Sequence, residues 1–179
     1  MADPFPRHRP NVGVVLFNAQ GLVWYGRRAG MTEGRAWQFP QGGVDKGEDL
    51  EAAARRELEE ETGVTSADLL GQTEGWIVYD FPEALKAQHV RDGRKPWDGQ
   101  KQAWFAFRFT GEDSEIALDR HAEIEFDAWR WGRLDEAPDL IVPFKREAYE
   151  QVVAAFRRFT DREMGTDLRS SSEPPRGER

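Results

Sequence analysis

The stretch from Gly42 to Val64 reads GGVDKGEDLEAAARRELEEETGV and decides how this chain should fold. Its glycine-rich start predicts a loop, and the residues from Asp49 to Thr62 predict a helix. Leu50, Ala54 and Leu58 recur every four residues within that helix, which brings them to one face. We expect this apolar face to pack against the rest of the protein.

Three glutamates share the face of the helix that should be buried. At about 100° per residue, Glu57 and Glu61 fall within about 20° of Leu50, and Glu60 lies at the other flank of the apolar stripe. Carboxylates turned toward the protein body need cations nearby, because desolvated anions repel one another at close range. Hard divalent cations such as Mg²⁺ meet that need. A solvated, charged helix end is the alternative, but it describes the glutamates of the opposite face better than these three.

The composition indicates one globular domain with a sizeable core. The chain has 179 residues, of which 39% are hydrophobic and 12% aromatic. It contains no Cys, which excludes a disulfide scaffold and thiol chemistry and agrees with a cytoplasmic location. No early segment joins a basic start to an apolar run, and no apolar run is long enough to span a bilayer. Neither export nor a membrane partner is therefore expected.

The net charge limits the partners further. A formal net charge of −8 argues against nonspecific binding along nucleic-acid backbones, so DNA is not expected as a partner. The same charge still allows a few well-placed cations to hold one phosphorylated end of a molecule.

Apolar patterning outside the first helix predicts a mixed sheet and a second helix. Strands are expected at residues 12–17, 22–26, 72–81, 101–109 and 126–131, and an amphipathic helix at residues 144–159. The polar segment 84–99 holds Gly and Pro and is predicted to be a mobile loop. We therefore predict an α/β or α+β fold, with a mixed β-sheet sandwiched between α-helices.

These elements occupy residues 9–160, which we predict to form one domain. Residues 1–8 are expected to be a flexible arm. Residues 165–179 lack apolar content and contain Ser-Ser-Ser and Pro-Pro, so we expect a disordered tail there.

Aligned from its first glycine, the opening stretch fits the pattern G-x5-E-x7-R-E-U-x-E-E-x-G-U, in which U is a bulky aliphatic residue. The fixed positions are Gly42, Glu48, Arg56, Glu57, Leu58, Glu60, Glu61, Gly63 and Val64. The segment is identified as a Nudix box, and a match at every fixed position of a loop–helix–loop is a specific signal. The resemblance implies the Nudix fold. It also implies a hydrolase that cleaves a nucleoside diphosphate linked to another moiety with the help of divalent metals.

Further segments extend the resemblance over about residues 9–159. They are residues 9–13, 37–43, 99–102, 125–131 and 144–146. Together they resemble the branch of bacterial RNA 5′-pyrophosphohydrolases and dinucleoside polyphosphate hydrolases. The loop from Gly30 to Trp37 departs from that branch by being a few residues longer, which could change the preferred base or leaving group.

The branch implies removal of pyrophosphate from the 5′-triphosphate end of RNA, which leaves a 5′-monophosphate. The near alternative is asymmetric hydrolysis of dinucleoside polyphosphates such as diadenosine tetraphosphate. A catalytically dead module that only binds nucleotides or proteins is disfavoured, because no box glutamate is missing. Hydrolysis of noncanonical nucleoside triphosphates is disfavoured by the match outside the box.

The resemblance also implies residues for metal binding and catalysis. The implied ligands of Mg²⁺ or Mn²⁺ are Glu57, Glu60, Glu61, Glu125 and the backbone of Gly42. Arg56 would orient a box glutamate through a bidentate contact. The general base is Glu57 or Glu125, and both alternatives stay open.

Substrate contacts are expected from a separate group of residues. They are Arg9, Arg28, Tyr79, Gln100, Lys101, Phe144 and Lys145. Arg28 and Lys145 match positions that meet substrate phosphates, and Arg9 could do the same. The two aromatic residues could stack a base, although aromatic side chains more often belong to the core. The remaining two could hold the nucleotide.

Overall fold

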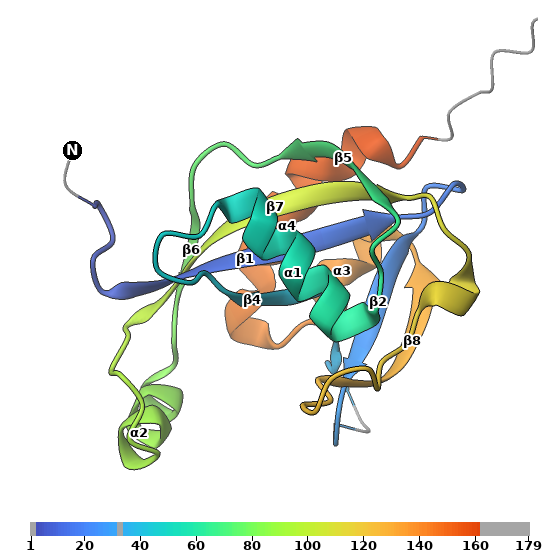
Figure 1. Ribbon diagram of the computed structural model, residues 1–179. Helices are drawn as coiled ribbons and strands as arrows, with labels where there is room; N and C mark the ends of the chain where they lie inside the picture. The colour runs from blue at the N-terminus through green and yellow to red at the C-terminus, as the bar shows by residue number, and fades with distance from the viewer. Residues whose placement is uncertain (1–2, 32–33, 162–179) are drawn as a thin grey trace, which may run out of the picture.

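Two long strands run parallel through the middle of the sheet in the computed structural model, which describes residues 3–31 and 34–161 (Figure 1). These strands are β1 (His8–Phe17) and β7 (Gly99–Phe109). The other strands all pair antiparallel. Strands β2 (Val23–Arg28) and β4 (Gln41–Gly43) pair with β1, and strands β5 (Ala67–Gln72) and β6 (Ile77–Asp80) pair with β7. Strands β3 (Trp37–Gln38) and β8 (Phe126–Gly132) pair with β2. The sheet is therefore mixed, as predicted.

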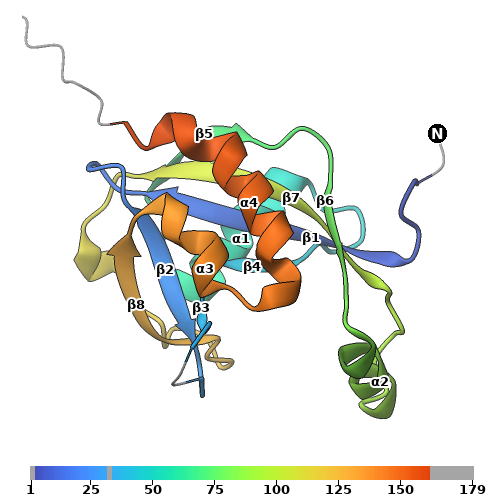
Figure 2. The same cartoon turned by 180° about the vertical axis from the view of Figure 1, so that it is seen from behind.

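Helices cover both faces of this sheet, which confirms the predicted sandwich. Helix α1 (Leu50–Thr62) lies on the face seen in Figure 1, and the short α3 (Ala137–Leu140) and α4 (Arg146–Phe156) lie on the face seen in Figure 2. Successive side chains of β1 pack against the helices on opposite faces of the sheet. Val14 packs in the cluster that contains Leu58 of α1, whereas Val15 packs in the cluster that contains Val152 of α4.

Local signals fix both ends of α1. The side chain of Asp49 accepts a hydrogen bond of 3.0 Å from the backbone N–H of Ala52, which caps the start of the helix. Gly63 ends it with φ of 77°, a left-handed conformation that glycine adopts without a steric penalty. Leu58 and Glu57 are both buried, so the helix turns its apolar stripe and one predicted glutamate toward the sheet.

The segment predicted as a mobile loop contains a helix, α2 (Glu83–Arg91), so that prediction was wrong. The helix follows Pro82, and its Ala, Leu, Lys and Gln residues favour helix formation. None of its residues is buried. Because α2 is exposed to solvent on most sides, its sequence is polar and lacks an apolar stripe. A polar sequence of this kind resembles that of a loop.

Other boundaries also differ from the prediction. Residues 72–81, predicted as one strand, hold the end of β5 and all of β6, with the chain turning between Gln72 and Ile77. The described residues include four α-helices where two were predicted. Residue 8, assigned to the arm, begins β1, and the predicted tail at residues 165–179 lies outside the described residues.

None of the helices in residues 3–31 and 34–161 combines the length and the apolar character that crossing a membrane requires.

Candidate active site

The loop and helix of the opening stretch meet at Gly42 and Glu57. Gly42 lies in β4, which pairs with β1, and Glu57 lies on the buried face of α1. A Cβ on Gly42 would overlap the carboxylate of Glu57. Any side chain at this position would displace that carboxylate, so the glycine is required by close approach and not by its backbone conformation.

Arg56 ties the loop to the helix through several hydrogen bonds. Its guanidinium donates to both carboxylate oxygens of Glu48, at 2.8 and 2.9 Å, and to the carbonyl oxygen of Gly43 at 2.9 Å. It also donates to Glu57 Oε1 at 2.8 Å. The bonds from Arg56 lower the pKa of Glu48 to about 2. Arg56 thus positions the carboxylate of Glu57, and its catalytic importance stays a prediction.

Four carboxylates gather near the C-terminal half of α1. Burial raises the pKa of Glu57 and raises the pKa of Glu61 well above its usual range, and Glu125 and Glu57 raise that of Glu61 further. Glu61 Oε2 accepts a hydrogen bond from the backbone N–H of Gln41 at 3.1 Å. Glu60 belongs to the same group but is exposed, so the expectation that it shares the buried face was wrong, because it lies at the flank of the apolar stripe. We call Glu57, Glu60, Glu61 and Glu125 the carboxylate cluster.

The carboxylate cluster has the donor chemistry that a hard divalent cation prefers. Among the described residues, no group of three or more His, Cys, Asp or Glu side chains is placed to hold a metal ion. Two of these carboxylates instead pair with Arg56, whose Nη1 lies 2.8 Å from Glu57 Oε1 and 3.3 Å from Glu60 Oε2. Oxygen donors and destabilised buried anions favour a cation, because the cation relieves the repulsion between them. The carboxylate oxygens are therefore suitable ligands for a divalent metal ion. To bind one, the side chains of the carboxylate cluster must move closer together.

A cavity of about 820 Å³ opens beside the carboxylate cluster. Gln41 and Glu125 lie where the cavity reaches the cluster. The cations along its wall are Arg9, Arg28, Arg35, Arg94, Lys95 and Lys145. Basic residues outnumber the acidic ones here, in a chain whose net charge is −8. The cavity is therefore suited to an anion such as a phosphorylated ligand.

Arg28 and Lys145, predicted to meet phosphates, lie at the inner part of this cavity near Glu125. Arg28 Nε is 3.9 Å from Glu125 Oε1. Lys145 is buried, and its Nζ lies 5.6 Å from the centre of the Tyr79 ring. No hydrogen bond or ion pair joins this Nζ to another described residue. Burial, with a smaller contribution from Arg28, lowers the pKa of Lys145 to about 8.

Replacing Lys145 by Met is expected to stabilise the fold and weaken catalysis. A buried ammonium without a paired anion costs folding free energy, on the order of 3 kcal/mol for a pKa lowered this far. The lost cation should reduce kcat/KM on a triphosphate by about tenfold, as expected for one charge-assisted contact. Chemical unfolding and steady-state kinetics measure the two effects. Arg158→Met, which removes an exposed cation, is the control and should change neither quantity appreciably.

The same residue makes stability depend on pH in a defined direction. The folded-state pKa of Lys145 is about 8, below its ordinary value of 10.5, so the unfolded chain binds this proton more tightly. The free energy of unfolding contributed by this group should therefore rise as pH increases from about 8 to about 10.5. Comparing wild type with Lys145→Met over this range isolates the contribution. Parallel pH profiles for the two proteins would contradict it.

The aromatic residues predicted to contact a base also line the cavity. The hydroxyl of Tyr79 donates a hydrogen bond to Gln100 Oε1, and the rings of Tyr79 and Phe144 are 5.9 Å apart. Tyr79 is buried, whereas Phe144 is partly exposed. Phe144 is therefore the better placed of the two to stack on a ligand, and Tyr79 holds Gln100 in position.

Arg9 and Lys101 lie in different environments. The guanidinium of Arg9 covers Gly43 and lines the cavity. Lys101 does not line the cavity: it is buried, its Nζ forms an ion pair with Asp3, and it lies 5.2 Å from the ring of Trp76. Side chains alternate along β7, so Lys101 points away from the face that carries Gln100. The structure does not support its predicted contact with the nucleotide.

Several cavity residues were not singled out from the sequence. Gln38 is buried and lines the cavity, and its Nε2 has no hydrogen-bond partner among the described residues. A buried donor without a partner is rare, and an acceptor from outside the chain, such as a water molecule or a ligand, would satisfy it. Arg94, Lys95 and Trp97 also line the cavity, from the connection between α2 and β7. The sequence predicts a loop for their segment, and its basic and aromatic residues are the only sequence signal of a binding surface there.

Comparison with known sequences gives matches over most of the chain. The family model described as NUDIX domain matches residues 7–152. The chain is 67% identical over 156 residues to an RNA pyrophosphohydrolase of Caulobacter vibrioides (strain NA1000 / CB15N), which covers 86% of this chain and 88% of that protein. It is 54% identical over 152 residues to an RNA pyrophosphohydrolase of Rhodospirillum rubrum, with coverages of 85% and 88%.

Solved structures share the arrangement of helices and strands at much lower identity. The E. coli dihydroneopterin triphosphate pyrophosphohydrolase superposes with a TM-score of 0.60 at 22% identity. A binary complex of a C. elegans Ap4A hydrolase superposes with a TM-score of 0.55 at 18% identity. Each comparison covers 83% of this chain and 98% of the other. At these identities the likeness concerns the fold alone.

Proposed function

Because the chain belongs to the NUDIX family, we propose that it is a hydrolase that removes pyrophosphate from the 5′-triphosphate end of RNA and leaves a 5′-monophosphate. The observation that carries this proposal is a basic cavity that adjoins the carboxylate cluster in an otherwise acidic chain. A 5′-triphosphate concentrates negative charge at one end of the substrate, which such a cavity can hold. The relatives named RNA pyrophosphohydrolase support the choice of RNA.

In this reaction, water attacks phosphorus and breaks the anhydride bond between the α- and β-phosphates. Pyrophosphate leaves, and the RNA keeps one phosphate. Lys145 and Arg28 would hold the outer phosphates, and Glu57 or Glu125 would accept the proton of the attacking water. Arg56 would keep Glu57 in place through the contact at 2.8 Å.

Nudix hydrolases generally use a divalent metal, and we propose Mg²⁺ or Mn²⁺ at the carboxylate cluster, with Gly42 allowing the close approach of backbone and carboxylate. A bound ion would lower the pKa of water and neutralise charge on phosphate oxygens. We place the activity in the cytoplasm, because triphosphorylated RNA ends are products of transcription there.

Asymmetric hydrolysis of dinucleoside polyphosphates such as diadenosine tetraphosphate is the second candidate. The cavity offers two separate aromatic surfaces, Phe144 near the inner cations and Trp97 on the α2 side. Two bases joined by a polyphosphate could each contact one of them. Both reactions require the same attack of water on phosphorus.

Side-by-side kinetics distinguish the two candidates. We expect purified protein to hydrolyse a 5′-triphosphorylated RNA oligomer with a higher kcat/KM than diadenosine tetraphosphate, at equal metal and salt concentrations. The products should be pyrophosphate and a 5′-monophosphorylated RNA, which mass spectrometry can identify. A clear preference for the dinucleotide would reverse the order of the candidates, and the absence of both activities would reject the proposal.

A further inference from the structure

Helix α2 stands away from the layered body of the protein, and contacts with Arg7 and His8 lie at its base. Figure 1 and Figure 2 both show α2 apart from α1 and from α4. At the base, the backbone N–H of Phe81 donates to the carbonyl of Asp98 at 2.8 Å. Arg7 Nε lies 2.6 Å from Asp98 Oδ2, and His8 Nε2 lies 2.7 Å from Asp80 Oδ1. Arg7 and His8 thus contact both ends of the segment formed by residues 81–98, which we call the excursion.

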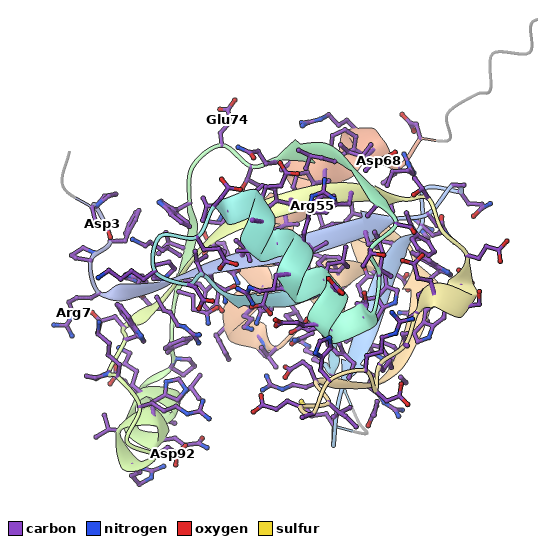
Figure 3. The ribbon with its side chains drawn as sticks, in the orientation of Figure 1. Asp3, Arg7, Arg55, Asp68, Glu74 and Asp92 are labelled. Atoms are coloured by element: carbon purple, nitrogen blue, oxygen red, sulfur yellow. The ribbon has the colours of Figure 1, made fainter. Side chains whose placement is uncertain are left out.

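The excursion turns a basic surface toward the cavity. Figure 3 shows Arg7 near its base and Asp92 at its far end, where the chain leaves α2. Arg94 and Lys95 follow, are exposed and line the cavity. Neither forms an ion pair with another described residue. Lys95 Nζ lies 3.9 Å from the centre of the Trp97 ring, so a cation–π contact holds the ammonium beside the cavity. We call Arg94 and Lys95 the outer cations.

The outer cations are separate from those that serve the reacting end. Arg28 lies 3.9 Å from Glu125, and both residues lie close enough to Lys145 to interact with its charge. The outer cations belong to the α2 side, because the backbone N–H of Arg94 donates to the carbonyl of His89 in α2 at 2.8 Å. Both views show α2 apart from α1. A triphosphate that occupies the inner site would meet Arg28 and Lys145 there. Additional cations at the outer wall therefore suit further phosphates of the same substrate.

We infer that the outer cations bind the phosphodiester backbone of RNA downstream of its 5′ end and so favour a polynucleotide over a dinucleotide. The inference rests on the proposed function. It follows from geometry, because the cavity that adjoins the carboxylate cluster at Glu125 carries the outer cations on its wall. Phosphate contacts of this kind are insensitive to sequence and weaken with salt.

The double variant Arg94→Ala/Lys95→Ala tests the inference on substrates of two lengths. On a triphosphorylated RNA of about eight nucleotides, kcat/KM should fall roughly tenfold, mainly through a higher KM. On diadenosine tetraphosphate and on a triphosphorylated dinucleotide, the loss should be much smaller. The slope of log KM against log salt concentration for the longer RNA should fall by about 1.4, since each single-strand phosphate contact contributes about 0.7.

A matched control removes two exposed cations elsewhere. Arg133→Ala/Arg157→Ala alters a second, smaller hollow that is lined by Leu134 and Val153, and it makes the same change in net charge. This variant should behave as wild type on both lengths of RNA. The charge-conserving Arg94→Lys/Lys95→Arg should recover most of the loss on the longer RNA. Melting temperatures of all variants should stay close to that of wild type, because the substituted side chains are exposed.

The outcomes separate this inference from the proposed function. A wild-type protein that hydrolyses neither RNA would reject the proposed function and, with it, the inference. An active wild type with equal losses on both lengths in the double variant would place the outer cations at the reacting end and overturn the inference. Unchanged kinetics on the longer RNA would overturn it as well.

Discussion

Hydrolysis is expected to fall to background in excess chelator and to return when Mg²⁺ or Mn²⁺ is added back. The carboxylates of Glu57 and Glu61 are disfavoured as anions, because desolvation and their acidic neighbours raise the pKa of both. A divalent cation relieves this repulsion and also contacts phosphate oxygens of the substrate. Without it, the substrate phosphates would approach a group of bare carboxylates of the same sign, which opposes binding.

Binding of the ion can be measured apart from activity. A cation that binds only the folded chain raises the melting temperature in proportion to the logarithm of its concentration once the site is saturated. Wild-type protein should therefore melt at a higher temperature in Mg²⁺ than in NaCl of the same ionic strength, which controls for screening. Glu57→Gln/Glu61→Gln should lose most of this difference. Full activity in excess chelator would reject metal dependence.

The helix that carries the carboxylates could be predicted from sequence because its signals are local. The cap at Asp49, the stop at Gly63 and the spacing of Leu50 and Leu58 all lie within the same short stretch. Together they determine which face is buried, and the structure places Glu57 on that face. The strands of the sheet followed for a similar reason, since the apolar run within β1 and the alternating apolar residues of β7 are both visible in the sequence.

The wall of the cavity could not be predicted in the same way. Helix α2 has no buried face, so no apolar periodicity marked it, and its residues reach the cavity through the fold of the chain. Lys101 shows a different limit, because its strand was predicted correctly but the face to which its side chain points was not. Its neighbour Gln100 lines the cavity, but one step along a strand reverses the side, and the register was not evident from a single sequence. The missing partner of Gln38 depends entirely on tertiary contacts.

Replacing Glu57 by Gln is expected to lower kcat by on the order of a hundredfold or more while the fold is kept. The amide has the shape of the carboxylate, so the fit against Gly42 is preserved. Arg56 keeps its two bonds to Glu48 and its bond to the Gly43 carbonyl, which limits any loss of stability. The substitution removes a negative charge that both the metal and the attacking water require.

Two further variants make this test specific to position. Glu59→Gln changes an exposed glutamate on the same helix and should leave kcat near the wild-type value. Gly42→Ala keeps every carboxylate but drives a methyl group into the space of the Glu57 carboxylate, so it should reduce kcat without removing any charge. Kinetics at saturating metal, together with circular dichroism, would separate these effects. If folded Glu57→Gln turned over at nearly the wild-type rate, the box helix would be structural here, since its buried carboxylate would have no part in the chemistry.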